Sequence, residues 1–261
     1  MPRIITLTTD FGPGSPYVAQ MKGVILSIDP EAALVDITHA IEPQNVRQGA
    51  LVLADATKWF PPETIHVAVV DPGVGTQRKI IYARLGAAHY VAPDNGLLSR
   101  LALETPPSTI IAVAEREFWL PQVSATFHGR DIMAPVAARL ALGLDPARLG
   151  PPQRELVRLD WAEVRVAANR IEGSVQSIDS FGNLVTDISA EVLARAPRGE
   201  EVAIVCDDHE TRGIFNTYAD QPEMTLIALV GSSGKLELAI VGDSAAEMLG
   251  IAVGTPVTIT W

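Results

Sequence analysis

The chain has 261 residues, 48% hydrophobic and 20% charged, which is enough apolar material for a substantial core and argues against disorder. Its formal net charge of −11 argues against a nucleic-acid-binding protein, because such a protein requires a basic face. The single cysteine, Cys206, excludes a disulfide within the chain and fits a reducing cytoplasm.

Strand-like and helix-like segments alternate through the first part of the chain. The apolar, β-rich segments typical of strands are residues 4–9, 33–37, 65–70, 80–85, 89–92 and 109–114. Helices are predicted from the N-cap Ser15 to about residue 28, and over residues 45–59, 97–103 and 132–142. This alternation predicts an α/β domain over residues 1–150, in which helices sandwich a largely parallel sheet.

The pattern changes after residue 143. Residues 145–152 carry three prolines and one glycine and resemble a domain linker. Short β-rich segments follow at residues 171–178, 202–205, 225–230, 236–240 and 257–260. Turn residues separate them, and only residues 190–195 and 245–249 look helical. The sequence therefore predicts an all-β C-terminal barrel over residues 151–261.

Targeting, membrane and metal signals are not found. The first residues, MPRIITLTTDFG, show no basic leader followed by a long apolar region. No apolar run approaches the roughly 18 residues that cross a bilayer. The five histidines lack the spacing of a metal site. We expect a cytoplasmic protein with no metal and no membrane or nucleic-acid partner.

Asp71 is the first candidate for chemistry. It follows the apolar run 65–70 and precedes Pro72 and Gly73, so we expect it at the carboxyl end of an interior strand, where open α/β sheets bind ligands. Arg78 comes seven residues later, and a turn can fold it back onto Asp71. From this stretch alone, a strand-ending aspartate with a solvated arginine remains the alternative.

His128 is the second candidate, between Phe127 and Gly129 and just before a predicted helix. Alone, such a histidine is more often a packed structural residue. Beside an arginine, however, the imidazole is kept neutral and able to accept a proton, and a carboxylate can orient it or a water molecule. Sequence alone does not show whether Asp71, Arg78 and His128 meet.

Asp10 follows the first predicted strand beside Gly12 and Gly14 and is well placed to accept hydrogen bonds from a ribose diol. A dinucleotide fingerprint is not indicated, because Tyr17 stands where the third glycine would be and Pro13 removes an amide donor. A carboxylate here favours a cationic or hydroxyl-rich ligand over a phosphorylated one.

Two polar loops in the C-terminal part offer ligand contacts. In residues 177–183, Asp179 can hold an ammonium group, Phe181 can stack on a planar ring, and Asn183 can read a base edge. The loop 231–234, which contains Ser232, can bind a carboxylate through its amides and hydroxyls. The alternatives are an Asx-rich turn and a plain hairpin loop.

Six motifs together carry a family resemblance over nearly the whole chain. They are TLTTDFG at residues 6–12, VAQMKGV at 18–24, VVDPGVGT at 69–76, APDNGLL at 92–98, TFHGRD at 126–131 and IDSFGNLVTDI at 178–188. With them, the chain resembles the S-adenosyl-L-methionine (SAM) hydroxide adenosyltransferases. These are adenosine-forming SAM hydrolases related to the bacterial fluorinase and chlorinase.

The resemblance implies a homotrimer without a cofactor, whose SAM sites lie between the N-terminal domain of one subunit and the C-terminal domain of its neighbour. It makes Asp71, Arg78 and His128 the water-activating triad. It also assigns the ligand contacts: Asp10 to the ribose hydroxyls, Asp179 to the methionine amine, Asn183 to the adenine edge, Ser232 to the methionine carboxylate, and Phe127 and Tyr218 near the ligand.

Within this family, the residues favour hydrolysis over halide transfer. In the fluorinase a tyrosine occupies the position of Asp71 and a serine that of Gly129, although the chlorinase also has glycine there. A carboxylate at residue 71 repels a halide but orients water. The fluorinase's long insertion before its APNNG turn is missing. We expect hydrolysis of SAM to adenosine and L-methionine; the alternatives are a chloride-dependent halogenase and a SAM- or adenosine-binding regulatory module.

Overall fold

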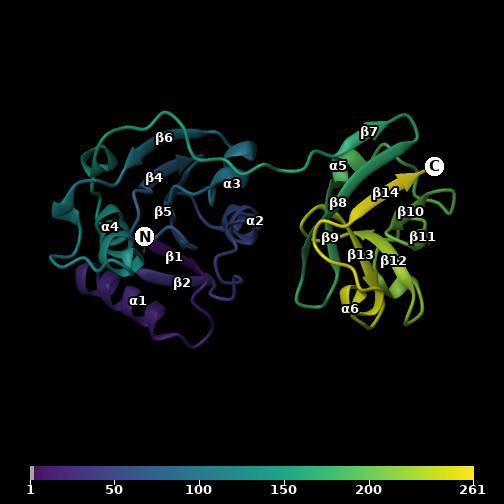
Figure 1. Cartoon of the computed structure of the whole chain (residues 1–261), viewed down its shortest axis with the longest axis horizontal. Helices are drawn as coiled ribbons and strands as arrows, with labels where there is room; N and C mark the ends of the chain where they lie inside the picture. The colour runs from purple at the N-terminus through teal and green to yellow at the C-terminus, as the bar shows by residue number, and fades with distance from the viewer. Residues whose placement is uncertain (1–2) are drawn as a thin grey trace. The chain divides into compact units, whose positions relative to one another are not determined.

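The computed structural model describes residues 3–261, which divide into two compact units between Leu159 and Asp160 (Figure 1). The sequence placed the boundary after residue 150. The N-terminal unit has a six-stranded sheet covered by helices, and the C-terminal unit is built almost entirely of strands. Among the described residues, no helix is both long and apolar enough to cross a membrane.

The sheet of the N-terminal unit has the strand order β2-β1-β3-β5-β4-β6. Its strands are β1 (Ile4–Thr9), β2 (Ala33–Thr38), β3 (Ile65–Val69), β4 (Ile80–Leu85), β5 (Ala88–Pro93) and β6 (Pro107–Ala112). The pairings of β1 with β2, β1 with β3 and β3 with β5 are parallel, whereas β4 is antiparallel to both neighbours. The expected largely parallel sheet is therefore mixed, because a short turn joins β4 to β5 as a hairpin.

Helices cover both faces of this sheet. They are α1 (Pro16–Ile28), α2 (Val46–Ala56), α3 (Ser99–Glu104) and α4 (Ala134–Ala141). Helices α1 and α4 pack against Val67 and Val69 of β3, whereas α2 and α3 belong to a second cluster with Ala68 and Val70. Alternate residues of one segment thus enter opposite cores, which explains why residues 65–70 form a continuous apolar run.

The predicted elements match the observed ones closely, with a few shifts. Ser15 caps α1 and Asn45 caps α2, and β1 and β4 have the predicted bounds. The strand predicted at 109–114 begins two residues earlier, as β6. The predicted helix 132–142 is α4, preceded by a π-helical turn at Gly129–Met133. Helix α2 ends at Ala56, followed by a 3-10 turn at Thr57–Trp59.

The C-terminal unit is an antiparallel, nearly closed barrel with the order β11-β10-β14-β8-β9-β13-β12. Its strands are β7 (Arg165–Ala167, paired with β8), β8 (Arg170–Ile178), β9 (Leu184–Ser189), β10 (Ala203–Cys206), β11 (His209–Arg212), β12 (Leu226–Val230), β13 (Lys235–Ile240) and β14 (Pro256–Thr260). Helices α5 (Ala190–Leu193) and α6 (Ala245–Leu249) are short. Thr211 Oγ1 donates to the Leu226 carbonyl at 2.7 Å, which links the two edge strands.

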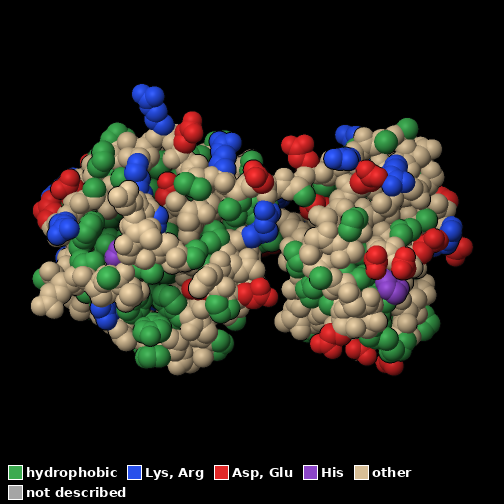
Figure 2. Space-filling view, viewed as in Figure 1, with side chains coloured by type: hydrophobic (Ala, Val, Ile, Leu, Met, Phe, Trp, Pro, Cys, Tyr) green, Lys and Arg blue, Asp and Glu red, His purple; other side chains and the backbone are tan. Residues whose placement is uncertain are grey.

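Three strands of the barrel were not predicted: β7, β9 and β11. Strand β7 has three residues and β11 is the polar sequence HETR, so neither shows an apolar alternation. Strand β9 directly follows the polar loop that ends at Asn183. The core of this unit nevertheless contains the expected apolar residues of β8, β10, β13 and β14. Figure 2 shows acidic side chains along the edge of this unit near α6, in keeping with the net charge.

Candidate active site

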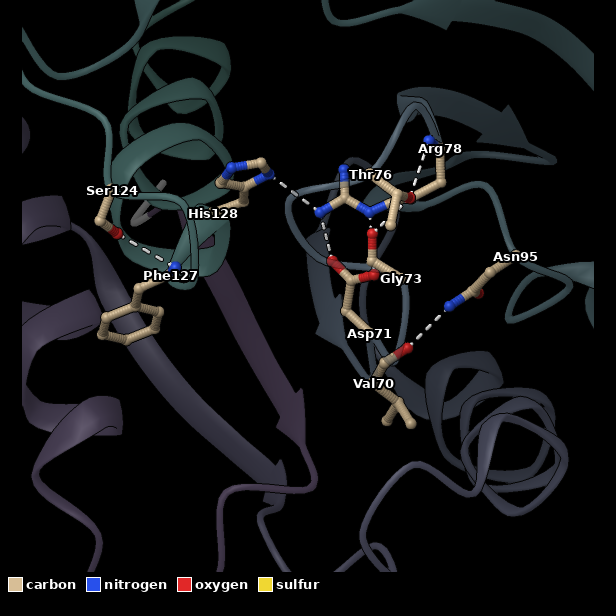
Figure 3. Close-up of polar contacts among 9 residues, drawn as sticks. All are labelled: Val70, Asp71, Gly73, Thr76, Arg78, Asn95, Ser124, Phe127 and His128. Atoms are coloured by element: carbon tan, nitrogen blue, oxygen red, sulfur yellow. Dashed lines mark hydrogen bonds and ion pairs between the residues drawn. The ribbon is translucent and has the colours of Figure 1, made fainter.

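Arg78 contacts both Asp71 and His128 at the carboxyl edge of the N-terminal sheet (Figure 3). Arg78 Nε donates to Asp71 Oδ1 at 2.8 Å, and Arg78 Nη2 donates to Asp71 Oδ2. The same Nη2 lies 3.0 Å from His128 Nδ1. The Asp71 and Arg78 side chains are only 5% and 11% exposed, so this bidentate ion pair is largely shielded from water. The alternative of a solvated arginine is therefore wrong.

The loop that carries Asp71 and Arg78 is a compact turn. Thr76 Oγ1 donates to the Gly73 carbonyl at 2.7 Å and accepts from the Arg78 amide at 3.2 Å. This internal bonding folds Arg78 back over Asp71. At the base of the loop, Asn95 Nδ2 donates to the Val70 carbonyl at 2.8 Å, which ties the end of β3 to a neighbouring turn.

Gly75 brings this loop against the segment that precedes His128. Its φ is +78°, a left-handed conformation, and a Cβ added there would lie 2.6 Å from the Ala125 carbonyl oxygen. Only glycine satisfies both the backbone angle and the close approach. The distance between Arg78 and His128, 50 residues apart in the chain, is set in part by this contact.

The segment before His128 is organised by Asp131, a residue to which the sequence analysis gave no role. Its side chain is fully buried and accepts hydrogen bonds from the Ser124 amide at 2.8 Å, Ser124 Oγ at 2.7 Å and Arg130 Nε at 2.6 Å. Ser124 Oγ accepts in turn from the Phe127 amide at 3.1 Å. Burial acts to raise the pKa of Asp131, but these hydrogen bonds outweigh it and lower the pKa. The only sequence signal was an Arg-Asp pair beginning a helix.

The environment of His128 keeps its imidazole neutral. Burial lowers its pKa and the Arg78 guanidinium lowers it further, while Asp71, Asp131 and a hydrogen bond to the Ser124 backbone act in the opposite direction. A guanidinium only donates, so Nδ1 facing Arg78 is the unprotonated nitrogen, and the proton of the neutral ring resides on Nε2. The His128 Nδ1 lone pair is therefore directed at the Asp71–Arg78 pair.

Asp10 lies at the same sheet edge, at the end of β1, which is the neighbour of β3. Its Oδ2 accepts from the Gln44 amide at 2.8 Å. Phe127 packs edge to face against Phe11 and Tyr17, with ring centroids 5.6 and 5.2 Å away. Figure 2 shows hydrophobic side chains exposed over α1, and Tyr17 in the first turn of this helix is 50% exposed. Asp10 and Phe127 thus share an edge with Asp71.

In the C-terminal unit, Asp179 and Asn183 are joined within one loop. Asp179 Oδ1 accepts from the amides of Phe181 and Asn183, both at 2.9 Å, and Asp179 Oδ2 accepts from Asn183 Nδ2 at 3.0 Å. Asn183 is buried, whereas the Phe181 ring is 76% exposed. The loop is therefore an Asx-type turn, which was the alternative stated for it from the sequence. It also exposes the aromatic ring of Phe181.

Tyr218 and Ser232 lie elsewhere on the same unit. Tyr218 is 42% exposed, and its hydroxyl donates to Glu237 Oε1. Glu237 is 6% exposed, and burial together with nearby Asp179 raises its pKa, although the Tyr218 hydrogen bond lowers it. No role was predicted for Glu237; its sequence signal was a carboxylate inside the apolar run of β13. Ser232 is exposed in the loop between β12 and β13.

A concave region of about 830 Å³ in the N-terminal unit is bordered by Arg78 and His128. Lys79, Arg116 and Trp119 also line it, so its wall is basic and partly aromatic. Among residues 3–261, no three His, Cys, Asp or Glu side chains come together in a way that would hold a metal ion.

Comparison with known proteins matches both units. Residues 5–150 match the family model for the SAM hydroxide adenosyltransferase N-terminal domain, and residues 173–258 match the model for the C-terminal domain. An (R)-S-adenosyl-L-methionine hydrolase of Thermus thermophilus is 40% identical over 267 residues, covering 98% of this chain and 99% of that protein.

A more distant enzyme and a solved structure are also similar to this chain. A fluorinase of Actinopolyspora mzabensis is 28% identical over 289 residues, covering 98% of this chain and 97% of that protein. The crystal structure of an uncharacterized conserved protein from Thermotoga maritima superposes with a TM-score of 0.94 at 35% identity, covering 98% of this chain and all of that one. The similarity thus extends through both units.

Proposed function

The chain belongs to the SAM hydroxide adenosyltransferase family, and on that premise we propose that it hydrolyses SAM to adenosine and L-methionine. The observation that carries the proposal is the contact of Arg78 with both Asp71 and His128. Relatives named (R)-S-adenosyl-L-methionine hydrolase at 35% to 40% identity support it over nearly the full chain.

The reaction is an in-line displacement at the ribose C5′. An oxygen of water forms a bond to C5′, the C5′–S bond breaks, and its electron pair stays on sulfur, which leaves as the neutral thioether of methionine. The water gives up one proton. Because the sulfonium is already a good leaving group, no general acid and no cofactor are required. The enzyme must orient the water, accept its proton and exclude bulk solvent.

The three contacting side chains divide these tasks. His128 is the proton acceptor or hydroxide holder. Its unprotonated nitrogen, Nδ1, faces Arg78 Nη2 at 3.0 Å, so to accept a proton from water it must exchange that contact for one with the water. Arg78 stabilises the incipient hydroxide and keeps His128 neutral. Asp71 holds the guanidinium through both carboxylate oxygens and positions the water. The ion pair holds the guanidinium in place, which reduces reorganisation during the reaction.

The remaining predicted residues recognise the substrate. Asp10 binds the ribose hydroxyls, and Asp179 binds the methionine amine. The other assignments are Asn183 on the adenine edge, Ser232 on the methionine carboxylate, and Phe127, Phe181 and Tyr218 around the nucleoside. The proposal includes a homotrimer, in which each SAM lies between the N-terminal unit of one subunit and the C-terminal unit of its neighbour.

Halide transfer is the competing reaction, since fluorinases are among the relatives. Asp71 disfavours it, because a carboxylate repels a halide but orients water. A binding module without turnover is the other alternative. The experiment is product identification after incubation with SAM, with and without chloride. Adenosine and methionine formed at a chloride-independent rate support hydrolysis, whereas a chlorinated nucleoside, or bound SAM without product, contradicts it.

A further inference from the structure

The turn that carries Asp10 is held on both sides by one residue, His39, which follows β2. Thr9, just before Asp10, places Oγ1 2.9 Å from His39 Nδ1. Gly12, two residues after Asp10, donates its amide to the His39 carbonyl at 2.9 Å. The Asp10 carboxylate itself accepts from the Gln44 amide in the same loop as His39. Three hydrogen bonds therefore fix the Thr9–Gly12 turn against the loop after β2.

The two nitrogens of the His39 ring face different partners. Nδ1 lies 2.9 Å from Thr9 Oγ1, which also accepts from the Phe11 amide at 3.3 Å. Nε2 lies 3.0 Å from Asp36 Oδ1.

Asp36 is in turn held by Lys22 from helix α1. Lys22 Nζ donates to Asp36 Oδ2 at 2.6 Å. Burial acts to raise the pKa of Asp36, but the contacts with Lys22 and His39 outweigh it and lower the pKa. Asp36 is therefore a carboxylate, and the series Lys22–Asp36–His39–Thr9 connects the helix to the Asp10 turn.

Thr9, His39 and Asp36 have the residue types of a hydrolytic triad, but the geometry does not suit nucleophilic catalysis. Thr9 is fully buried, and its hydroxyl oxygen accepts from a backbone amide, so no substrate carbon can reach it. The Asp10 carboxylate of this turn is half-buried, whereas Thr9 is fully buried. These contacts therefore hold the neighbouring Asp10 carboxylate in position, and Thr9 does not act as a nucleophile.

We propose that His39 is a positioning residue for ribose recognition, which fixes the Thr9–Gly12 turn so that the Asp10 carboxylate meets the 2′- and 3′-hydroxyls together. This inference rests on the proposed function, in which Asp10 binds the diol. A carboxylate that accepts two hydrogen bonds at once must be held within roughly 0.5 Å of its working position. His39 supplies this precision from outside the ligand site.

The test measures binding of adenosine and 2′,3′-dideoxyadenosine by calorimetry to the full chain and its variants. His39→Ala should weaken adenosine binding by about 10-fold or more, while dideoxyadenosine affinity changes less than about 2-fold, because the dideoxy compound makes no diol contact. Thr9→Val, which keeps the shape and removes the hydroxyl, should act in the same direction. His89→Ala, which removes a hydrogen-bonded histidine at the opposite end of the sheet, is the matched control.

The outcomes separate this inference from the proposed function. If His39→Ala and Thr9→Val weaken the binding of both nucleosides equally, the role of His39 is merely structural and the inference is overturned. The inference is also overturned if the variants keep the wild-type preference for adenosine. If wild-type protein binds neither adenosine nor SAM, the proposed function fails first. Thermal unfolding of each variant shows whether the measured protein is folded.

Discussion

The two units hold their candidate site residues in different ways. In the N-terminal unit, Asp71, Arg78 and His128 come from distant segments and fix one another through a shielded ion pair and an imidazole contact. In the C-terminal unit, Asp179 and Asn183 are fixed by bonds within one short loop, and Phe181 is exposed. The first arrangement joins distant segments of the chain, whereas the second is held within a single loop that leaves an aromatic ring exposed.

This difference predicts that changes in the Asp71–Arg78–His128 group act on turnover and that changes in the Asp179 loop act on affinity. The largest effect is expected for His128→Ala. Removing the proton acceptor should lower turnover of saturating SAM by about 100- to 10,000-fold, the usual contribution of a positioned base. Steady-state kinetics measures this, with His209→Ala on β11 as control. Unchanged turnover in His128→Ala removes His128 from the mechanism.

Gly75→Ala tests how the loops are held together. The added Cβ would combine a left-handed φ of +78° with a contact of 2.6 Å to the Ala125 carbonyl. We expect a loss of about 2–4 kcal/mol in unfolding free energy, or an equivalent displacement of Arg78 from His128 that lowers turnover.

Gly143→Ala is the matched control for this variant. Gly143 has a φ of +91° but nothing within 4 Å of an added Cβ, so it carries the backbone strain alone. Its cost should be about 1 kcal/mol, measured by chemical denaturation. Equal costs for the two variants contradict the importance of the Gly75–Ala125 contact.

Asp179→Asn should affect affinity and leave chemistry intact. Asparagine keeps one acceptor for the loop but loses the charge that holds the ammonium group. The affinity for S-adenosylhomocysteine should fall by about 10-fold, while adenosine affinity and saturated turnover stay close to wild type. Glu172→Gln, an exposed change on the same unit, is the control. A fall in saturated turnover without loss of affinity contradicts the division of roles between the Asp71–Arg78–His128 group and the Asp179 loop.

The smallest effect concerns the pKa of His128, which is depressed by burial first and by Arg78 second. The neutral, active form should persist as pH falls below the ordinary histidine value of about 6.5, and activity should decline only as pH falls through the lower pKa of the folded protein. By NMR titration, Arg78→Gln should raise the His128 pKa and Asp71→Asn should lower it. Titration at or above 6.5 in the wild type contradicts this account.

Much of the N-terminal unit could be predicted because its signals are local. The run 65–70, the Ser15 cap and the loop Asp71–Thr76 are each encoded within a few residues. The order of the strands in the sheet was harder to predict from the sequence, because the position of β4 between β5 and β6 is set by contacts with distant segments. In the C-terminal unit, β11 has little apolar patterning, because it is an edge strand with polar side chains.

The supporting residues of the site were the least predictable. Asp131, Glu237 and His39 act through contacts whose partners are set by tertiary structure, such as the 30-residue separation of Thr9 and His39. Residue type alone does not distinguish them from ordinary turn or surface residues. Asp71, Arg78 and His128 were accessible as candidates because their chemistry is recognisable, but their meeting depends on Gly75 and on the buried Asp131.

The central claim is that water attacks the ribose C5′ directly. The measurement is a single turnover of SAM, with enzyme in excess, in water enriched in heavy oxygen, followed by mass spectrometry of the nucleoside and of the protein. The account predicts adenosine with the heavy oxygen at C5′ and an unlabelled protein. Unlabelled adenosine with the heavy oxygen in the Asp71 carboxylate would show a covalent ester intermediate and contradict direct attack.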